Sequence, residues 1–183
     1  MAESGEGRMQ QAIYPAEVSD IPAIEQLRHE VWRATFPQVA PDHITVGDVD
    51  LIFADLTQGI ERGEKALDDP AVGIFVAKQA ETLDGFVIAK KQDNQKREIA
   101  SLYVAPELHG GGIGSALLNT AMAWLEAEEY PIYLETISTN YPAIKFYEKR
   151  GFVKSADIPF EQPKPPLKYI PHIAMVRQPA SIV

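Results

Sequence analysis

Apolar residues recur every three or four positions along residues 18–36, which is the period of an amphipathic helix. Ser19 or Asp20 can cap the start of this helix, and Pro22 falls in its first turn, where proline is tolerated. The face expected to be buried consists of Ile21, Ile24, Leu27 and Val31. An apolar stripe predicts a second helix over about residues 46–62. That stripe consists of Val49, Ile52, Phe53, Leu56 and Ile60.

After Pro70 the pattern changes to short runs rich in β-branched and aromatic residues. Two of these runs, residues 73–79 and 85–92, predict a β-hairpin joined through residues 80–84. Further strands are predicted at residues 12–14, 98–105, 131–137, about 151–156 and 172–177. Two more helices are predicted at about residues 113–128 and 140–151. This order of elements favours an α/β fold with a mixed sheet over a repeated strand–helix–strand array.

The length of 183 residues suggests one domain. Residues 1–11 are predicted to form a flexible tail, and residues 12–183 a single domain. Five of the fourteen prolines fall within residues 159–171, which predicts an irregular, Pro-rich insertion before the last strand.

Composition narrows the classes of function. Apolar residues make up 45% of the chain, which is enough for a packed core, and no apolar run is long enough to span a membrane. The chain has no cysteine, which excludes disulfides and thiolate catalysis and fits a cytoplasmic location. The net charge of −9, without a basic cluster, argues against a nucleic-acid partner and favours cationic small molecules. The four histidines lack metal-ligand spacing, so no metal site is expected.

The stretch "ELHGGGIGSALL", residues 107–118, places glycines directly before a predicted helix. A glycine-rich turn at a helix N-terminus is a general site for anions, because backbone N–H groups can approach phosphate oxygens. The NTPase phosphate loop is excluded, since its lysine is missing. A dinucleotide fingerprint is a less favoured alternative: Gly110 and Gly112 fit it and Glu135 follows about twenty residues later, but Ser115 stands at its sixth position.

Two motifs in order resemble those of the GNAT family of N-acetyltransferases. In the first pattern, [Q/R]-x-x-G-x-[G/A], Gly112 and Gly114 take the two small positions, while His109 departs from the pattern by standing in the Gln/Arg place. The second reads "NYPAIKFYEKRGF", from Asn140 to Phe152. The resemblance covers about residues 12–178. It implies the GNAT-type fold, with a mixed central sheet of about seven strands flanked by about four helices.

The resemblance also implies acetyl-CoA as cosubstrate and a set of residues that hold it. The fourth strand of such a sheet diverges from the fifth, and pantetheine pairs with the freed edge, which here would be Leu102, Tyr103 and Val104. The phosphates would rest on the amides of His109, Gly110, Gly111, Gly112, Ile113, Gly114 and Ser115. Asn140 and Tyr147 share one face of a helix, so both can point at one bound ligand. Tyr147 is the candidate that protonates the leaving sulfur, while Asn140 can also be a simple N-cap.

The base is expected to be Glu98, with Glu135 or an ordered water as alternatives, since both carboxylates lie on strands near the expected cleft. The predicted reaction is direct attack by an amine within a ternary complex, because the chain has no cysteine to carry an acyl group. The expected partner is a small-molecule or peptide amine of cationic character, with no membrane or nucleic acid; a homodimer is also compatible with the family. The alternative function is a non-catalytic acetyl-CoA-binding sensor or assembly module.

Overall fold

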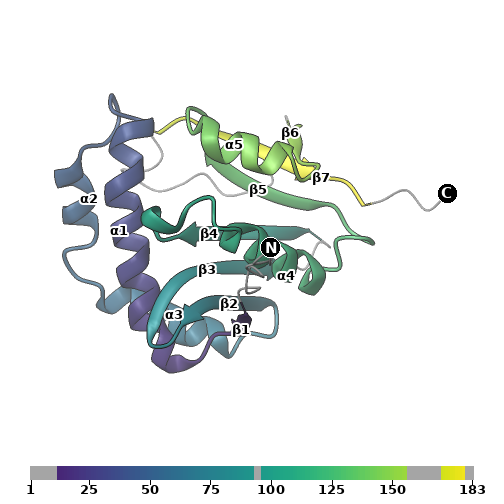
Figure 1. Ribbon diagram of the computed structural model, residues 1–183, viewed down its shortest axis with the longest axis horizontal. Coiled ribbons are helices and arrows are strands. Elements are labelled where there is room, and N and C mark those ends of the chain that lie inside the picture. The colour runs from purple at the N-terminus through teal and green to yellow at the C-terminus, as the bar shows by residue number, and fades with distance from the viewer. Residues whose placement is uncertain (1–11, 93–95, 156–169, 180–183) are drawn as a thin grey trace, which may run out of the picture.

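The computed structural model describes residues 12–92, 96–155 and 170–179. Its centre is a seven-stranded sheet in the order β1-β2-β3-β4-β5-β7-β6 (Figure 1). The strands are β1 (Ile13–Pro15), β2 (Val72–Gln79), β3 (Thr82–Lys91), β4 (Arg97–Val104), β5 (Ile132–Ile137), β6 (Val153–Ser155) and β7 (His172–Arg177). Within the described residues only β4 and β5 pair in parallel, and all other neighbours are antiparallel. The mixed sheet is as expected, and it lacks the parallel array that a dinucleotide site requires.

Helices cover both faces of the sheet. They are α1 (Ile21–Val39), α2 (Val46–Ile52), α3 (Thr57–Leu67), α4 (Ile113–Trp124) and α5 (Tyr141–Glu148), with short 3-10 turns η1 (Val18–Asp20) and η2 (Pro106–Leu108). The inner face of α1 packs with Phe86 and Val76 on one side of the sheet. On the other side, Leu117 of α4 and Tyr147 of α5 pack with Leu134 of β5. The predicted α1 face is correct, since all four of its apolar residues are buried.

The prediction of one helix over residues 46–62 is wrong, because the chain breaks there into α2 and α3, which gives five α-helices rather than four among the described residues. In the break, Asp55 Oδ1 accepts a hydrogen bond of 2.9 Å from the Thr57 amide. This side-chain acceptor offers the backbone an alternative to a continuing helix. The apolar stripe is then divided between two clusters: Val49 packs near Phe36, whereas Ile60 packs against the α1 side of the sheet.

Other boundaries differ by a few residues. The hairpin turn is tighter than predicted, since Gln79 pairs with Thr82 and leaves a two-residue connection at Ala80 and Glu81. Ala80 adopts a positive φ of 53°, as tight hairpin turns require. The predicted helix 113–128 ends at Trp124. The tail at residues 1–11 and most of the Pro-rich segment 159–171 lie outside the described residues.

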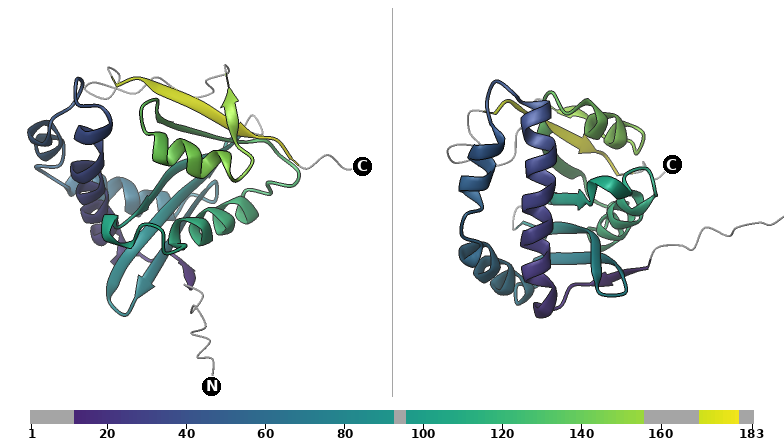
Figure 2. Two further views of the ribbon diagram at one scale, coloured as in Figure 1. Left: turned by 45° about the horizontal axis from the view of Figure 1, so that its top comes forward. Right: turned by 60° about the vertical axis from the view of Figure 1, so that its left-hand side comes forward.

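The feature that positions the site is a divergence of β4 from β5. The two strands pair only from Arg97–Ile132 to Ile99–Leu134. In the pairing of β3 with β4, Ala89 faces Ile99 and Ile88 faces Ser101, so Ala100 is an extra residue, a β-bulge. A bulge bends its strand and increases the local twist. Beyond it, β5 continues along β7 while β4 follows β3, and the two halves of the sheet open like a V (Figure 2).

Candidate functional site

The divergence leaves an open strand edge in the middle of the sheet, at Leu102, Tyr103 and Val104 of β4. In an antiparallel pair, N–H and C=O groups of alternate residues point away from the partner strand. Along this part of β4 they therefore face the open side, where β5 has departed. Leu102 and Val104 pack toward α4 and α5, whereas Tyr103 packs toward α1. An extended ligand with amide groups can pair with this edge as a strand would.

The glycine loop lies where the open edge ends. Gly110 and Gly112 have positive φ values of 83° and 94°, which a side chain disfavours. A Cβ atom at either position would meet nothing within 4 Å, so both face open space. Gly112 is also the N-cap of α4. Backbone conformation explains the glycine at both positions, and the space above them is available to a ligand.

Several amides of this loop lack backbone partners. Gly111 donates to the Leu108 carbonyl at 3.2 Å and Ser115 to the Gly112 carbonyl at 3.0 Å. Within the described part of the chain, no backbone carbonyl accepts from the amides of Gly110, Gly112, Ile113 or Gly114. Unpaired N–H groups at a helix N-terminus carry partial positive charge and bind anions. The loop therefore has the geometry of a phosphate site.

His109 takes no part in that array through its ring. The side chain is exposed, and its Nε2 lies 3.1 Å from the Val104 carbonyl oxygen at the end of the open edge. Arg150, which the sequence did not single out, contacts the start of α4 beside the loop. Arg150 Nη2 donates to the hydroxyl oxygen of Ser115, in the first turn of α4. In the sequence, Arg150 is one basic residue near the end of the helix predicted over residues 140–151, and nothing there shows which helix lies alongside.

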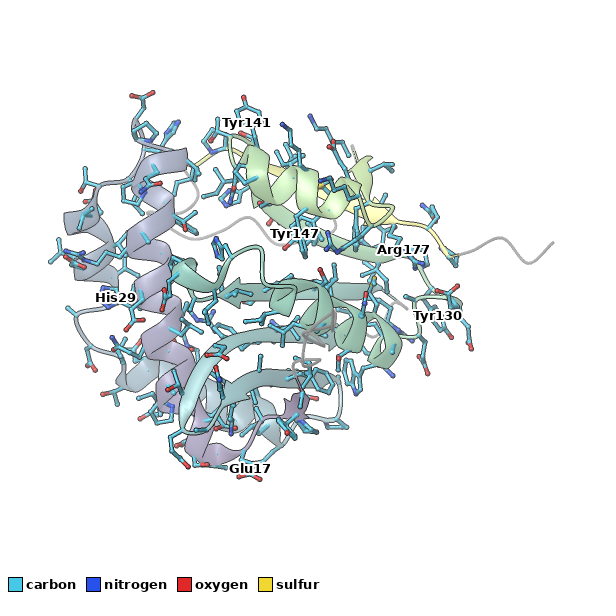
Figure 3. The ribbon with its side chains drawn as sticks, in the orientation of Figure 1. Glu17, His29, Tyr130, Tyr141, Tyr147 and Arg177 are labelled. Carbon is cyan, nitrogen blue, oxygen red and sulfur yellow. The ribbon has the colours of Figure 1, made fainter. Side chains whose placement is uncertain are left out.

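Tyr147 lies between α5 and α4 (Figure 3). Its ring is buried, with 8% exposure, and contacts the rings of Phe146 and Phe152. Its hydroxyl makes no hydrogen bond to any described residue, so no group of those residues occupies its donor. Burial raises the pKa of Tyr147 well above its ordinary value, so the hydroxyl is protonated at neutral pH.

Asn140 lies at the opposite end of α5 and caps it. Its Oδ1 accepts from the Ala143 amide at 3.3 Å, which is the simple N-cap role. The Nδ2 group has no partner among the residues that the structure describes. Asn140 thus caps α5 through its Oδ1, and no described residue occupies its Nδ2 donors, which can bind a ligand.

On the α1 face of the open edge, the Tyr103 hydroxyl accepts from Trp32 Nε1 at 2.9 Å. Trp32 stacks on Phe36 with ring centroids 4.4 Å apart, and its edge meets Phe53. Burial raises the pKa of Tyr103 as well. Although Tyr103 and Tyr147 belong to opposite faces of the sheet, the charge of one raises the pKa of the other.

The two candidate bases lie on one face. Glu98 pairs with Tyr133 across the parallel strands, so Glu135 stands two residues further along the neighbouring strand, on the same side. Burial raises the pKa of Glu98. The hydrogen bond that Gln92 Nε2 donates to Glu98 Oε2, at 2.9 Å, acts in the opposite direction and lowers this pKa. Burial also raises the pKa of Glu135, and the Glu98 charge raises it further. Glu135 lies within β5, which continues to Ile137 as the predicted strand does. Their roles as bases stay predictions.

Other kinds of site receive no support from the described residues. Among residues 12–92, 96–155 and 170–179, no three potential His, Asp or Glu ligands come together. No described helix has the length and apolarity needed to cross a membrane. A surface cavity of about 420 Å³ lies along the second half of α4, between Asn119 and Glu129, away from the glycine loop.

Comparison with known proteins points to one family. The model of the acetyltransferase (GNAT) family matches residues 24–152. An uncharacterized N-acetyltransferase of Mycobacterium tuberculosis is 29% identical over 117 residues, which cover 63% of this chain and 71% of that protein. A mycothiol acetyltransferase of Propionibacterium freudenreichii is 36% identical over 105 residues, covering 53% of this chain and 33% of that protein.

The fold has a counterpart among solved structures. The PaiA N-acetyltransferase of Thermoplasma acidophilum, in complex with coenzyme A, superposes with a TM-score of 0.73 at 19% identity. The superposition covers 93% of this chain and 99% of that protein. At this identity the likeness concerns the fold, which agrees with the expected sheet and its flanking helices.

Proposed function

The chain belongs to the GNAT family of acetyltransferases, and on this premise we propose that it transfers acetyl from acetyl-CoA to a primary amine of a small molecule or peptide. One observation carries the proposal. The open edge of β4 begins near Glu98 and Glu135 and ends at the glycine loop, several of whose amides are unpaired, and Tyr147 packs on the α4 and α5 side of this edge. Acetyl-CoA has its thioester, its pantetheine amides and its diphosphate in the same order along the molecule.

The acyl donor is assigned to the open edge and the loop. Its pantetheine amides pair with the backbone at Leu102, Tyr103 and Val104, and its diphosphate rests on the amides of residues 109–115. The relative from Thermoplasma acidophilum, which holds coenzyme A, supports this choice of ligand. Backbone N–H groups of the β4 edge are suited to stabilise the oxyanion of the tetrahedral intermediate.

The acceptor must lose a proton before it attacks. An alkylammonium with a pKa of about 10.4 needs about 4–5 kcal/mol to become a neutral amine at pH 7. Glu98 or Glu135, directly or through water, takes this proton, and the raised pKa of each carboxyl makes it a better base than an exposed one. The amine nitrogen then bonds to the carbonyl carbon, the carbon–sulfur bond breaks, and Tyr147 donates its proton to the thiolate. Attack is direct, within a ternary complex.

The acceptor is proposed to be cationic. Two half-buried carboxylates lie on the acceptor face, and the chain carries a net charge of −9. Both features raise the local concentration of positively charged amines. Polyamines, amino sugars and peptide amines all have the required group.

The test is thiol release from acetyl-CoA in the presence of an amine panel, with the N-acetylated amines as matched controls. Because the protein has no cysteine, a thiol reagent detects only coenzyme A. Release that depends on both enzyme and free amine supports the proposal. Binding of acetyl-CoA without release for any amine supports instead a non-catalytic sensor or assembly module. Binding of NAD and not acetyl-CoA would overturn the assignment altogether.

A further inference from the structure

Beside the glycine loop stands a cation that has no counterion among the described residues. Arg150, two residues past the end of α5, is only partly exposed, and burial lowers the pKa of its guanidinium. Among the described residues no carboxylate lies within ion-pair distance of it. A half-buried charge is normally paired, because its desolvation is costly. The arrangement thus has room for one anion.

The position of this guanidinium is fixed from three sides. Nη2 donates to the Ser115 hydroxyl oxygen, and Nη1 donates to the Phe146 carbonyl at 2.6 Å. The guanidinium carbon lies 3.6 Å from the centroid of the Phe146 ring, which itself packs against Gly114. A guanidinium has five N–H donors, so these two contacts leave three. Those donors lie beside the first turn of α4, where the amides of Ile113 and Gly114 have no backbone partner among the described residues.

A purely structural role is the competing explanation. Cations at a helix C-terminus stabilise the last carbonyls, and the contact with Phe146 is of this kind. That role does not explain the bond to Ser115, which belongs to a different helix. Nor does the His109 ring turn toward the loop amides, since its Nε2 lies 3.1 Å from the Val104 carbonyl oxygen.

We infer that Arg150 is the side chain that binds the diphosphate of acetyl-CoA, with the unpaired loop amides on one side and its free N–H donors on the other. The inference rests on the proposed function. The planar fork of arginine suits two oxygens of one phosphate, which a lysine cannot match. Ser115 and Phe146 hold the fork in place before the ligand arrives, so little side-chain freedom is lost on binding.

The test compares Arg150→Gln with Lys149→Gln, which removes a neighbouring exposed cation of the same turn. Calorimetric titration uses three probes: acetyl-CoA, its 3′-dephospho analogue, and S-acetyl-pantetheine, which has no phosphate. Arg150→Gln is expected to weaken the first two by the same factor, about tenfold to a hundredfold, as for hydrogen bonds to charged groups. S-acetyl-pantetheine binding stays unchanged. Lys149→Gln changes each affinity less than about twofold.

Three results would overturn the inference. A loss confined to acetyl-CoA assigns Arg150 to the 3′-phosphate, an equal loss for S-acetyl-pantetheine makes its role structural, and unchanged affinity removes it from the site. If Arg150→Gln fails to fold, Arg150→Lys takes its place, with a smaller loss expected for the two diphosphate ligands alone. Wild-type protein that binds no acetyl-CoA overturns the proposed function too, whereas binding without amine acetylation leaves this inference standing.

Discussion

Replacing Tyr147 by phenylalanine removes one oxygen from the proposed site and leaves the packing intact. The ring stays in its buried contacts with Phe146 and Phe152. The lost hydroxyl has no hydrogen bond to any described residue, so no polar group of those residues is left unsatisfied. The expected change in the free energy of unfolding is therefore within about 0.5 kcal/mol.

The expected effect on turnover is much larger. Proton delivery by a positioned side chain contributes about 10²–10⁴ in rate, which corresponds to about 2.7–5.4 kcal/mol of transition-state stabilisation. We therefore expect kcat to fall by that factor while the affinity for acetyl-CoA changes less than about threefold. Because burial raises the pKa of Tyr147, the proton is in place throughout the neutral range, and its loss should limit the wild-type rate only above about pH 10.

The assay is steady-state thiol release at saturating acetyl-CoA, with calorimetry for the affinity and thermal melting for the fold. Tyr141→Phe is the matched control, since Tyr141 opens the same helix but is 64% exposed; it should leave all three measurements unchanged. An unchanged kcat in Tyr147→Phe would refute the role as acid. A fall in the wild-type kcat near pH 8 that is absent from Tyr147→Phe would also refute the reasoning. It would mean that Tyr147 loses its proton near pH 8, whereas burial raises its pKa.

Two further changes test the carboxylates and the loop. The pKa of Glu135 is higher in the folded than in the unfolded protein. The stability that this carboxyl contributes is therefore present below its unfolded-state pKa and is lost as the pH rises through its folded-state pKa, so the charged side chain is unfavourable at pH 7. Glu135→Gln should thus raise the melting temperature at pH 7 by about 1–3 °C, a gain that shrinks toward pH 4, and a lower melting temperature at pH 7 would contradict this. Gly112→Ala forces a side chain into a φ of 94° and should destabilise by about 1–2 kcal/mol. Gly114→Ala meets only an ordinary contact of 3.5 Å with Phe146, so its melting temperature should stay near wild type, and equal losses in both variants would refute the backbone argument.

Local signals in the sequence predicted most elements because their causes are local. Asn140 begins α5 as its N-cap, and Gly151 follows its end with a φ of 84°. Gly112 starts α4 in a conformation that few other residues adopt. In each case the residue type that starts or stops the element is visible without any knowledge of what packs nearby.

Contacts between distant segments were not predictable in the same way. The bulge at Ala100 carries no glycine or proline to mark it, since its cause is the pairing with β3 on one side and β5 on the other. The meeting of Arg150 with Ser115 depends on how α5 lies against α4. The break between α2 and α3 depends on Asp55, whose side chain competes with a helix that the apolar stripe alone favoured.

The bulge also explains why the candidate site lies where it does. In a continuous sheet the side chains of Tyr103 and Tyr147 would be separated by a layer of paired backbone, because they belong to opposite faces. Once Ala100 turns β4 away from β5, that layer is interrupted, and groups from both faces border one opening. A donor on the α4 and α5 side and an acceptor on the side of Glu98 and Glu135 can then meet without either crossing a strand. The proposed reaction therefore depends on the register of three strands as much as on the glycine motif, since restoring the β4–β5 pairing would close the opening while leaving every motif residue in place.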